Sequence, residues 1–348
     1  MPKVAIQDVR RYAKRAGAVI VGLLASLAAL AAWAWHVRAD IADTGLHPQV
    51  VDDPPDDAVT ATWFGVTMLL FDDGETQILV DSFVSRPTLF ESLTGRPVTS
   101  DAPMINYVMN EYGMDRLAAI VPAHSHYDHA MDVGAIANRS SASILGSEST
   151  ANLARGWGVP EDQIVVAETG VTYSFGDFSV TLVPSAHAPI GLRGEVPLAG
   201  TVDEPLELPA PITAWREGGS FSIVISHPQG TTIVQGSAGF REGALDDVQA
   251  DVVMLGVGLL ESLGRDYTER YWQALVTSTG AMQVFPVHFE DQTRPFGEIV
   301  LPPKLIDNFV RTAQWLQEMR DTWDRDTRVY LPTFGQPLVL YPEQAPDA

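Results

Sequence analysis

The sequence is most informative at His124-Ser125-His126-Tyr127-Asp128-His129, where four potential metal ligands fall within six residues. This stretch follows the apolar run Leu117–Val121 and Pro122, which predicts a loop that leaves a buried strand. Imidazoles two positions apart can converge on one cation, whereas Asp128 and His129 would point to a second position nearby. The stretch therefore predicts half of a two-metal site.

Two further histidines lie where the remaining ligands are expected. His187 follows the alternating run 178–184, and His288 follows Val284-Phe285-Pro286-Val287. A side chain directly after a strand emerges at the edge of a sheet, so both are predicted metal ligands. His36, His47 and His227 have no such context and are interpreted as structural or solvated.

The motif, the later histidines and a Gly-rich hairpin end resemble, in order and spacing, the metallo-β-lactamase superfamily of hydrolases over residues 58–341. Within it, His126-Tyr127-Asp128-His129 with Asp132 is most similar to the branch of N-acylphosphatidylethanolamine phospholipase D and the ascorbate phosphate lactonases. The resemblance implies an αββα sandwich and two metal ions, expected to be zinc with manganese or iron as alternatives. It assigns His124, His126 and His187 to the first metal, and Asp128, His129 and His288 to the second.

One position departs from the superfamily pattern. Most members place a bridging Asp after a strand in Gly-Asp-Thr-Gly, where this chain has Gly236-Ser237-Ala238-Gly239. A neutral hydroxyl cannot offset the repulsion of two dications as a carboxylate does, so the second metal is expected to bind less tightly. A decayed, inactive site is the alternative interpretation.

Composition narrows the class of partner. The chain has 348 residues, 46% of them hydrophobic, no cysteine and a net charge of −22. Six basic residues against two acidic ones in residues 1–40 give that segment +4, which leaves the remainder near −26. Such a surface repels phosphate backbones, so nucleic acid is excluded as a partner and a small-molecule substrate is expected.

The first 57 residues are predicted to lie outside the catalytic domain. Residues 16–35 form an uncharged apolar run long enough to cross a bilayer, preceded by basic residues and closed by Trp33 and Trp35. We therefore expect a cytoplasmic basic stub and transmembrane anchor (1–35), an acidic Pro-rich tether (36–57) and a catalytic domain (58–348) that is periplasmic or extracellular. The alternative is a signal peptide that is cleaved to release a secreted protein.

Alternation of strands and helices favours two sheets covered by helices on both outer faces. Strands are predicted at 59–71, 77–81, 117–121, 143–145, 163–166, 171–174, 178–183, 221–225, 231–235, 251–255 and 283–287. Helices are predicted at 131–138, after Ser147, near 267–276 and after Pro303. The last carries an apolar stripe that includes Leu305, Ile306, Leu316 and Trp323.

The segment 188–219 is rich in Pro and Gly and starts at the predicted ligand His187. A long irregular loop in a compact domain is usually either functional or disordered. We expect this insertion to cover the cleft and to contact substrate through Leu192, Arg193 or Trp215, with a passive surface loop as the alternative.

The predicted function is hydrolysis by a metal-activated hydroxide on the carbonyl of an ester, lactone or lactam. Asp128 would ligate metal and orient the nucleophile, and Ser237 would hydrogen-bond to it. Asp81 and Asp132 are predicted to hold imidazoles in one tautomer. A phosphodiesterase of the phospholipase D kind, and a membrane-anchored metal-binding protein without catalysis, are the two alternatives.

Overall fold

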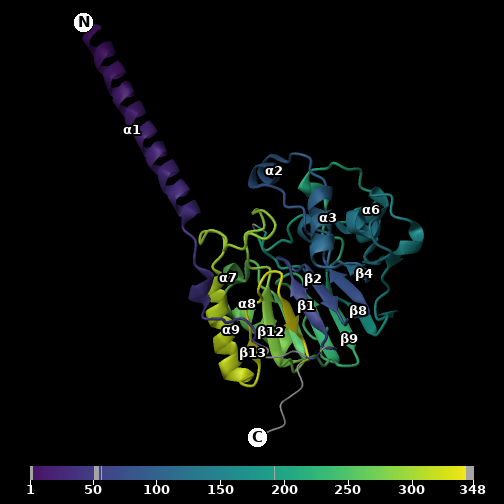
Figure 1. Cartoon of the computed structure of the whole chain (residues 1–348). Coiled ribbons are helices and arrows are strands. Elements are labelled where there is room, and N and C mark those ends of the chain that lie inside the picture. The colour runs from purple at the N-terminus through teal and green to yellow at the C-terminus, as the bar shows by residue number, and fades with distance from the viewer. Residues whose placement is uncertain (1–2, 51–54, 56, 192, 342–348) are drawn as a thin grey trace.

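Two β-sheets pack face to face in the computed structural model, which describes residues 3–50, 55, 57–191 and 193–341 (Figure 1). The first sheet runs in the order β14 (Pro337–Val339), β1 (Thr60–Trp63), β2 (Leu69–Asp72), β3 (Gln77–Val80), β4 (Leu117–Val121), β5 (Ser143–Gly146) and β6 (Ile164–Val166). The second runs in the order β13 (Arg328–Val329), β12 (Gln283–Val287), β11 (Val252–Gly256), β10 (Gly230–Gln235), β9 (Phe221–His227), β8 (Phe178–Pro184) and β7 (Thr172–Phe175).

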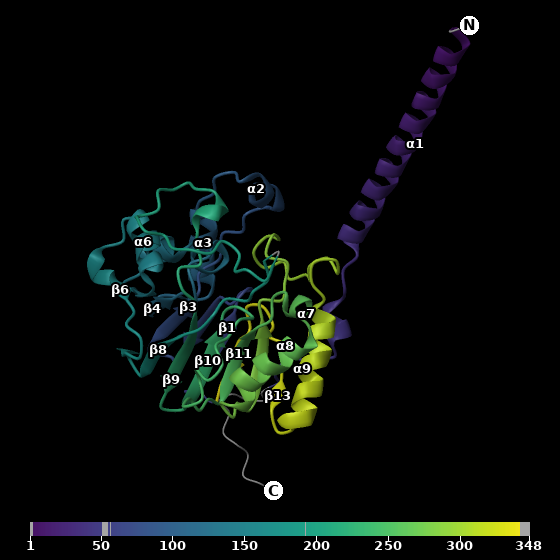
Figure 2. The ribbon, with the colours of Figure 1, turned by 180° about the vertical axis from the view of Figure 1, so that it is seen from behind.

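Helices cover the outer face of each sheet, as the view from behind also shows (Figure 2). The first sheet carries α3 (Ala102–Glu111), α4 (Tyr127–Ala130), α5 (Val133–Ala137) and α6 (Glu148–Gly156). The short helix α2 (Leu89–Thr94) has no buried residue and lies at the end of the domain (Figure 1). The second carries α7 (Leu260–Leu263), α8 (Arg265–Trp272) with its π-helical continuation Gln273–Thr277, and α9 (Phe309–Trp323). Single 3-10 turns lie at Ile41–Thr44, Glu161–Gln163 and Ile212–Ala214.

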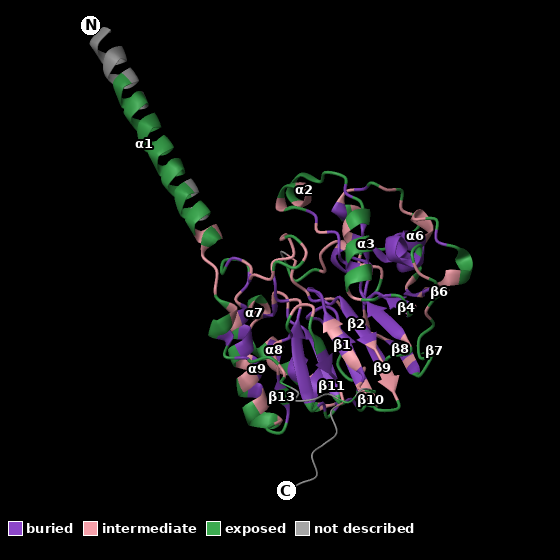
Figure 3. Ribbon diagram, viewed as in Figure 1, coloured by how far each residue is buried: buried purple, intermediate pink, exposed green. Residues whose placement is uncertain are grey.

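The core divides into two apolar clusters, which explains the layering. One fills the space between the sheets and continues under α8 and α9, with Phe71 and Ile233 among its buried members. The other lies between the first sheet and its helices and includes Ile120 and Ile136. Burial therefore concentrates in the sheets (Figure 3), and the predicted αββα arrangement of the domain is confirmed.

Most of the predicted strands are confirmed, but residues 59–71 form two strands rather than one. A tight turn separates β1 from β2: the Phe64 N–H donates to Met68 O at 2.9 Å, and Gly65 and Val66 have φ of +89° and +46°. The left-handed backbone suits Gly65. The turn was not predicted because Val66 is apolar and continues the strand-like pattern. The short strands β13 and β14 also lacked a sequence signal.

The last helix begins later than its apolar stripe predicts. Residues 303–307 form a turn in which the Ile306 N–H donates to Pro303 O at 2.7 Å, and α9 starts only at Phe309. Leu305 and Ile306 are 70% and 45% exposed, whereas Leu316 is fully buried. The stripe is thus core only between Phe309 and Met319, and Trp323 at the end of α9 is 40% exposed.

Part of the expected tether packs on the domain. Leu46 belongs to the core between the sheets, and the Gln49 side chain donates to Val339 O at 2.8 Å. Residues 51–54 and 56 lie outside the described residues. Ahead of this segment, α1 (Lys3–His36) extends away from the domain and is long and apolar enough over Lys14–His36 to cross a membrane.

Replacement of a buried residue of α9 tests its register. Leu316→Ala is expected to lower the free energy of unfolding by about 2–5 kcal/mol, because the side chain leaves a cavity in the core. Leu305→Ala, four residues before the helix, is expected to change it by less than about 0.5 kcal/mol. Denaturant unfolding followed by circular dichroism measures both. Equal losses in the two variants would contradict the helix boundary at Phe309.

Candidate metal centre

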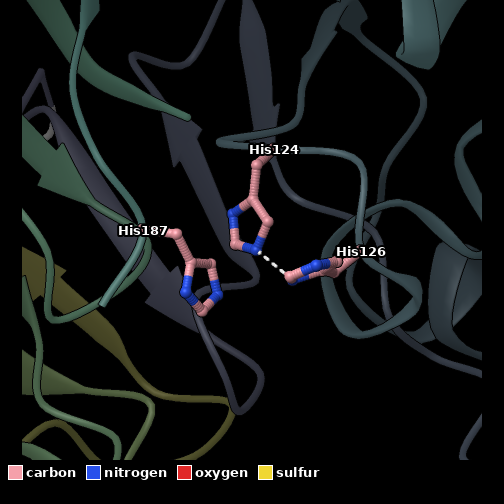
Figure 4. Close-up of side chains that lie close together, drawn as sticks. All are labelled: His124, His126 and His187. Atoms are coloured by element: carbon pink, nitrogen blue, oxygen red, sulfur yellow. Dashed lines mark hydrogen bonds between the residues drawn. The ribbon is translucent and has the colours of Figure 1, made fainter. Parts of the chain in front are cut away.

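Three histidines from two sheets meet at one point. His124 and His126 lie on the loop that leaves β4, and His187 follows β8. One nitrogen from each ring lies within 4.8 Å of the others (Figure 4). His124 Nε2 and His126 Nδ1 are 2.9 Å apart, so either a proton lies between them or both lone pairs face a shared cation. The sequence-predicted first ligand group is thus brought together.

The second predicted group also converges. Asp128 and His129 lie on α4, and His288 follows β12 in a left-handed backbone conformation, with φ of +63°. Asp128 Oδ2 lies 3.6 Å from His129 Nε2 and 3.4 Å from His288 Nε2. A helix was predicted only from residue 131, but the short helix α4 already starts at Tyr127. It turns Asp128 and His129 toward His288 at the end of β12.

Burial keeps the first group in the form that binds metal. It lowers the pKa of His124 well below its usual value, assisted by the neighbouring imidazoles, and it lowers the pKa of His187 to about 4. Burial also lowers the pKa of His126. Neutral imidazoles offer a lone pair to a cation, so this donor set fits a divalent metal such as zinc.

A buried carboxylate orients His129. Asp81 directly follows β3 and accepts hydrogen bonds from His129 Nδ1 at 2.6 Å, from the Ala123 N–H at 2.7 Å and from the Thr67 hydroxyl. The predicted contact of Asp81 with an imidazole is confirmed. Burial acts to lower the pKa of His129, but Asp81 and Asp128 outweigh it and raise the pKa. His129 Nε2 is left facing Asp128 and the second ligand group.

Asp132 does not hydrogen-bond to an imidazole in the described part of the chain, so the prediction that it holds one in a single tautomer is wrong. Its carboxylate accepts from the Val84 N–H, the Ser85 N–H and the Ser85 hydroxyl, each at 2.7 Å, and so it fixes the loop after β3. Residue 132 lies at the break between α4 and α5, where the i,i+4 relation to Asp128 no longer places the two on one helix face.

Sequence reasoning missed the turn between β1 and β2 as a support for His288. Val66 O accepts from the His288 N–H at 2.8 Å and from Trp63 Nε1 at 2.9 Å. Glu290 accepts from the Val66 N–H and pairs with Arg86 at 3.5 Å. These partners are far apart in the sequence, so no local pattern could have identified them.

The 188–219 loop packs on α6 and returns to the ligand loop. Asn152 Nδ2 donates to Val202 O at 2.8 Å, and the Ser125 N–H donates to Glu217 O at 3.0 Å. Trp215 is 1% exposed and fills the core under the first sheet, so its predicted substrate contact is wrong. Arg193 is exposed, and Leu192 lies outside the described residues.

Ser237 lies close behind the ligands. Its hydroxyl accepts from the Ala188 N–H at 2.9 Å, one residue after His187. A Cβ on Gly236 would lie 3.6 Å from ring atoms of His129, which places this segment against the centre. Its predicted bridging position stays a prediction. Among the described residues, neither ligand group includes His36, His47 or His227, and His227 lies 3.6 Å from Asp73 instead.

The chain is similar to known proteins in sequence and in fold. The family description "Metallo-beta-lactamase superfamily" matches residues 61–279. A UPF0173 metal-dependent hydrolase of Ruegeria sp. is 29% identical over 127 residues, which are 36% of this chain and 47% of that protein. A UPF0173 metal-dependent hydrolase of Pyrobaculum aerophilum is 26% identical over 65% of this chain and 82% of its own length. The chain thus spans about half the length of the Ruegeria relative.

A solved structure agrees on the fold. The structure of a possible metal-dependent hydrolase from Veillonella parvula superposes with a TM-score of 0.51 at 14% identity, over 81% of this chain and 100% of that one. The profile match covers more than half of the chain and contains the ligand loop after β4, His187 and Ser237. The chain belongs to the metallo-β-lactamase superfamily.

Proposed function

We propose that the protein is a metal-dependent hydrolase that acts on the carbonyl of an ester, lactone or lactam. One observation carries the proposal: two groups of three ligands converge side by side, with Asp128 Oδ2 3.6 Å from His129 Nε2 and 3.4 Å from His288 Nε2. The relatives in Ruegeria and Pyrobaculum carry the name metal-dependent hydrolase, which supports this class of reaction.

Each group has a distinct task in this proposal. His124, His126 and His187 would hold one zinc ion, and Asp128, His129 and His288 would hold the other. When bound, two such ions would supply a hydroxide nucleophile at neutral pH and polarise the oxygen of the carbonyl whose carbon is attacked. Asp128 orients the nucleophile, Asp81 fixes the tautomer of His129, and Ser237 steadies the His187 loop through the Ala188 N–H.

Ser237 favours a carbonyl substrate over a phosphodiester. Cleavage of a phosphodiester benefits more from a closely held metal pair, which a bridging carboxylate would stabilise. A serine hydroxyl carries no charge to offset the repulsion between two dications. Within the branch that the sequence resembles, this preference favours the lactonases over phospholipase D. The strongly acidic chain is consistent with a substrate other than nucleic acid.

We also propose that α1 anchors the enzyme in a membrane, with the catalytic domain on the outer side. Support comes from the length and apolarity of Lys14–His36, from the basic residues ahead of it and from Trp33 and Trp35 at its end. The first described residues after α1 attach at once to the domain, since the Lys304 N–H donates to Val37 O at 2.9 Å.

Removal of one first-group ligand tests the metal centre. The full chain saturated with zinc is expected to hold two ions that a chelator removes in two steps, because only the second group includes a carboxylate and no carboxylate bridges the pair. His124→Ala should lose the ion of the first group, and its rate of ester hydrolysis should fall at least about 100-fold. His227→Ala is the matched control and should keep both. Elemental analysis after dialysis measures the zinc content, and a single ion in the unmodified protein would contradict two sites.

Substitution at residue 237 tests its position. Ser237→Asp is expected to raise zinc affinity at the weaker site, because an anion between two dications offsets their repulsion. Ser237→Ala should lower turnover without releasing metal. Competition with a chromophoric chelator measures both affinities. Unchanged affinity in a folded Ser237→Asp protein would show that residue 237 does not lie between the metals.

Protease accessibility tests the anchor and its orientation. In intact bacterial cells whose outer membrane has been permeabilised, added protease is expected to digest the catalytic domain, because positive-inside orientation leaves it outside. Immunoblots against the C-terminal half measure its loss, with a cytoplasmic protein as the control. A protected domain would contradict the orientation, and a mature N-terminus near residue 35 would contradict the anchor.

A further inference from the structure

A cavity of about 230 Å³ opens beside the second ligand group, because His288 forms part of its wall. The rest of the wall comes from segments far apart in sequence: Trp35 at the end of α1, Leu89 of α2, and parts of the chain around residues 259, 290 and 306. A compound bound here would present one end to the candidate metal centre and the other to the end of α1.

Half of the wall residues have apolar side chains. Trp35, Leu89, Leu259, Phe289, Pro302, Pro303 and Ile306 contribute. Two of its acidic side chains have cationic partners, since Glu290 lies 3.5 Å from Arg86 and Asp291 lies 2.8 Å from Arg38. The third, Asp307, accepts from the N–H groups of Leu259 and Asn308. Because no described lining residue is a lysine or arginine and the neighbouring Arg86 and Arg38 are already paired, this wall suits an uncharged apolar chain rather than an anionic group.

Two wall residues near His288 carry buried oxygens without a hydrogen-bond partner among the described residues. Glu290 is 7% exposed, and its Oε2 atom has no partner within the described chain. The same is true of Gln292 Oε1. Buried acceptors without partners are rare because each costs the free energy of its lost hydration.

The cavity also lies at the base of the apolar helix. Arg38, two residues after α1, pairs with Asp291 and bridges to Pro303, which both line the cavity. Two residues span at most about 7 Å, so the helix must end at the cavity whatever its tilt. If α1 spans a bilayer, the cavity opens at its surface.

Exposed apolar side chains surround this end of the domain. Phe90 and Leu93 of α2 are 61% and 77% exposed, and Leu305 and Ile306 are 70% and 45% exposed. We call these four residues the apolar rim. Figures 1 and 2 both place α2 and the chain before α9 on the side from which α1 departs. Lys304, the only lysine after residue 14, adjoins the rim. This composition fits the interface of a bilayer.

We propose that this cavity binds an uncharged amphiphile with a long acyl chain, which enters from the membrane surface along the apolar rim. This inference rests on the proposed carbonyl hydrolysis and on the membrane anchor. In the reaction water adds to the ester or lactone carbonyl, and the carbon–oxygen bond to the alkoxy group breaks. The products are a carboxylate with its released proton and an alcohol. Trp35 makes the anchor itself part of the substrate pocket.

Activity on two esters provides the first test, with the full chain in neutral phosphatidylcholine nanodiscs. The kcat/KM for p-nitrophenyl dodecanoate should exceed that for p-nitrophenyl acetate by at least tenfold. Ile306→Trp, which fills the cavity from a half-exposed position, should lower the dodecanoate value at least tenfold and the acetate value less than twofold. Val166→Trp on the distant strand β6 is the matched control. Equal loss on both esters, or no preference for dodecanoate, would overturn the pocket assignment.

A photoreactive dodecyl glycerol ether tests the pocket without any turnover. Crosslinks are expected near Leu259, Phe289 and Ile306. Unlabelled ether added before irradiation should prevent them at a concentration at least tenfold lower than dodecyl phosphate requires. Crosslinks confined to α1, or preferred displacement by the phosphate, would overturn the proposal. Crosslinks in the cavity of a protein that hydrolyses neither ester would refute carbonyl hydrolysis while supporting the binding site. Phe90→Ser with Leu305→Ser should lower crosslinking severalfold, and an unchanged yield would refute entry along the rim.

Discussion

The buried carboxylate of Asp81 joins the parts on which the rest of the site depends. It follows β3, accepts from the Ala123 N–H at the start of the ligand loop, and accepts from His129 Nδ1 and the Thr67 hydroxyl. A carboxylate with no exposed surface is costly to bury unless its oxygens are hydrogen-bonded. Those bonds connect the strand framework to the geometry of the second ligand group.

The two ligand groups draw on both sheets, so the site exists only when the sheets are packed. The first sheet supplies the four ligands that follow the carboxyl end of β4, namely His124, His126, Asp128 and His129. The second sheet supplies His187 after β8 and His288 after β12. Val66 adds a link across this division by accepting from the His288 N–H. Metal bound at both groups would therefore stabilise the packing of the sheets, since binding to the folded state alone adds to its stability.

The position of α1 ties the proposed chemistry to the proposed location. Arg38 attaches the end of this helix to the domain through Asp291 and Pro303, beside the cavity that His288 lines. A flexible tether would have allowed the domain to drift from the bilayer. Packing of Leu46 and the Gln49 hydrogen bond instead hold residues 38–49 against the sheets, so the cavity stays at the helix end.

Features that depend on local spacing could be predicted from the order of residues alone. His-x-His-x-Asp-His after an apolar strand identified four candidate ligands, and two later strand ends added His187 and His288. The alternation of strands and helices indicated the αββα fold, because strand ends and loop spacing are local properties. The groups that support those ligands could be identified only in the folded chain. Folding placed Asp132 on Val84 and Ser85, buried Trp215, and brought Trp35 to a cavity beside His288. These contacts join distant parts of the chain, and their directions depend on side chains that emerge only when both sheets and their helices have packed.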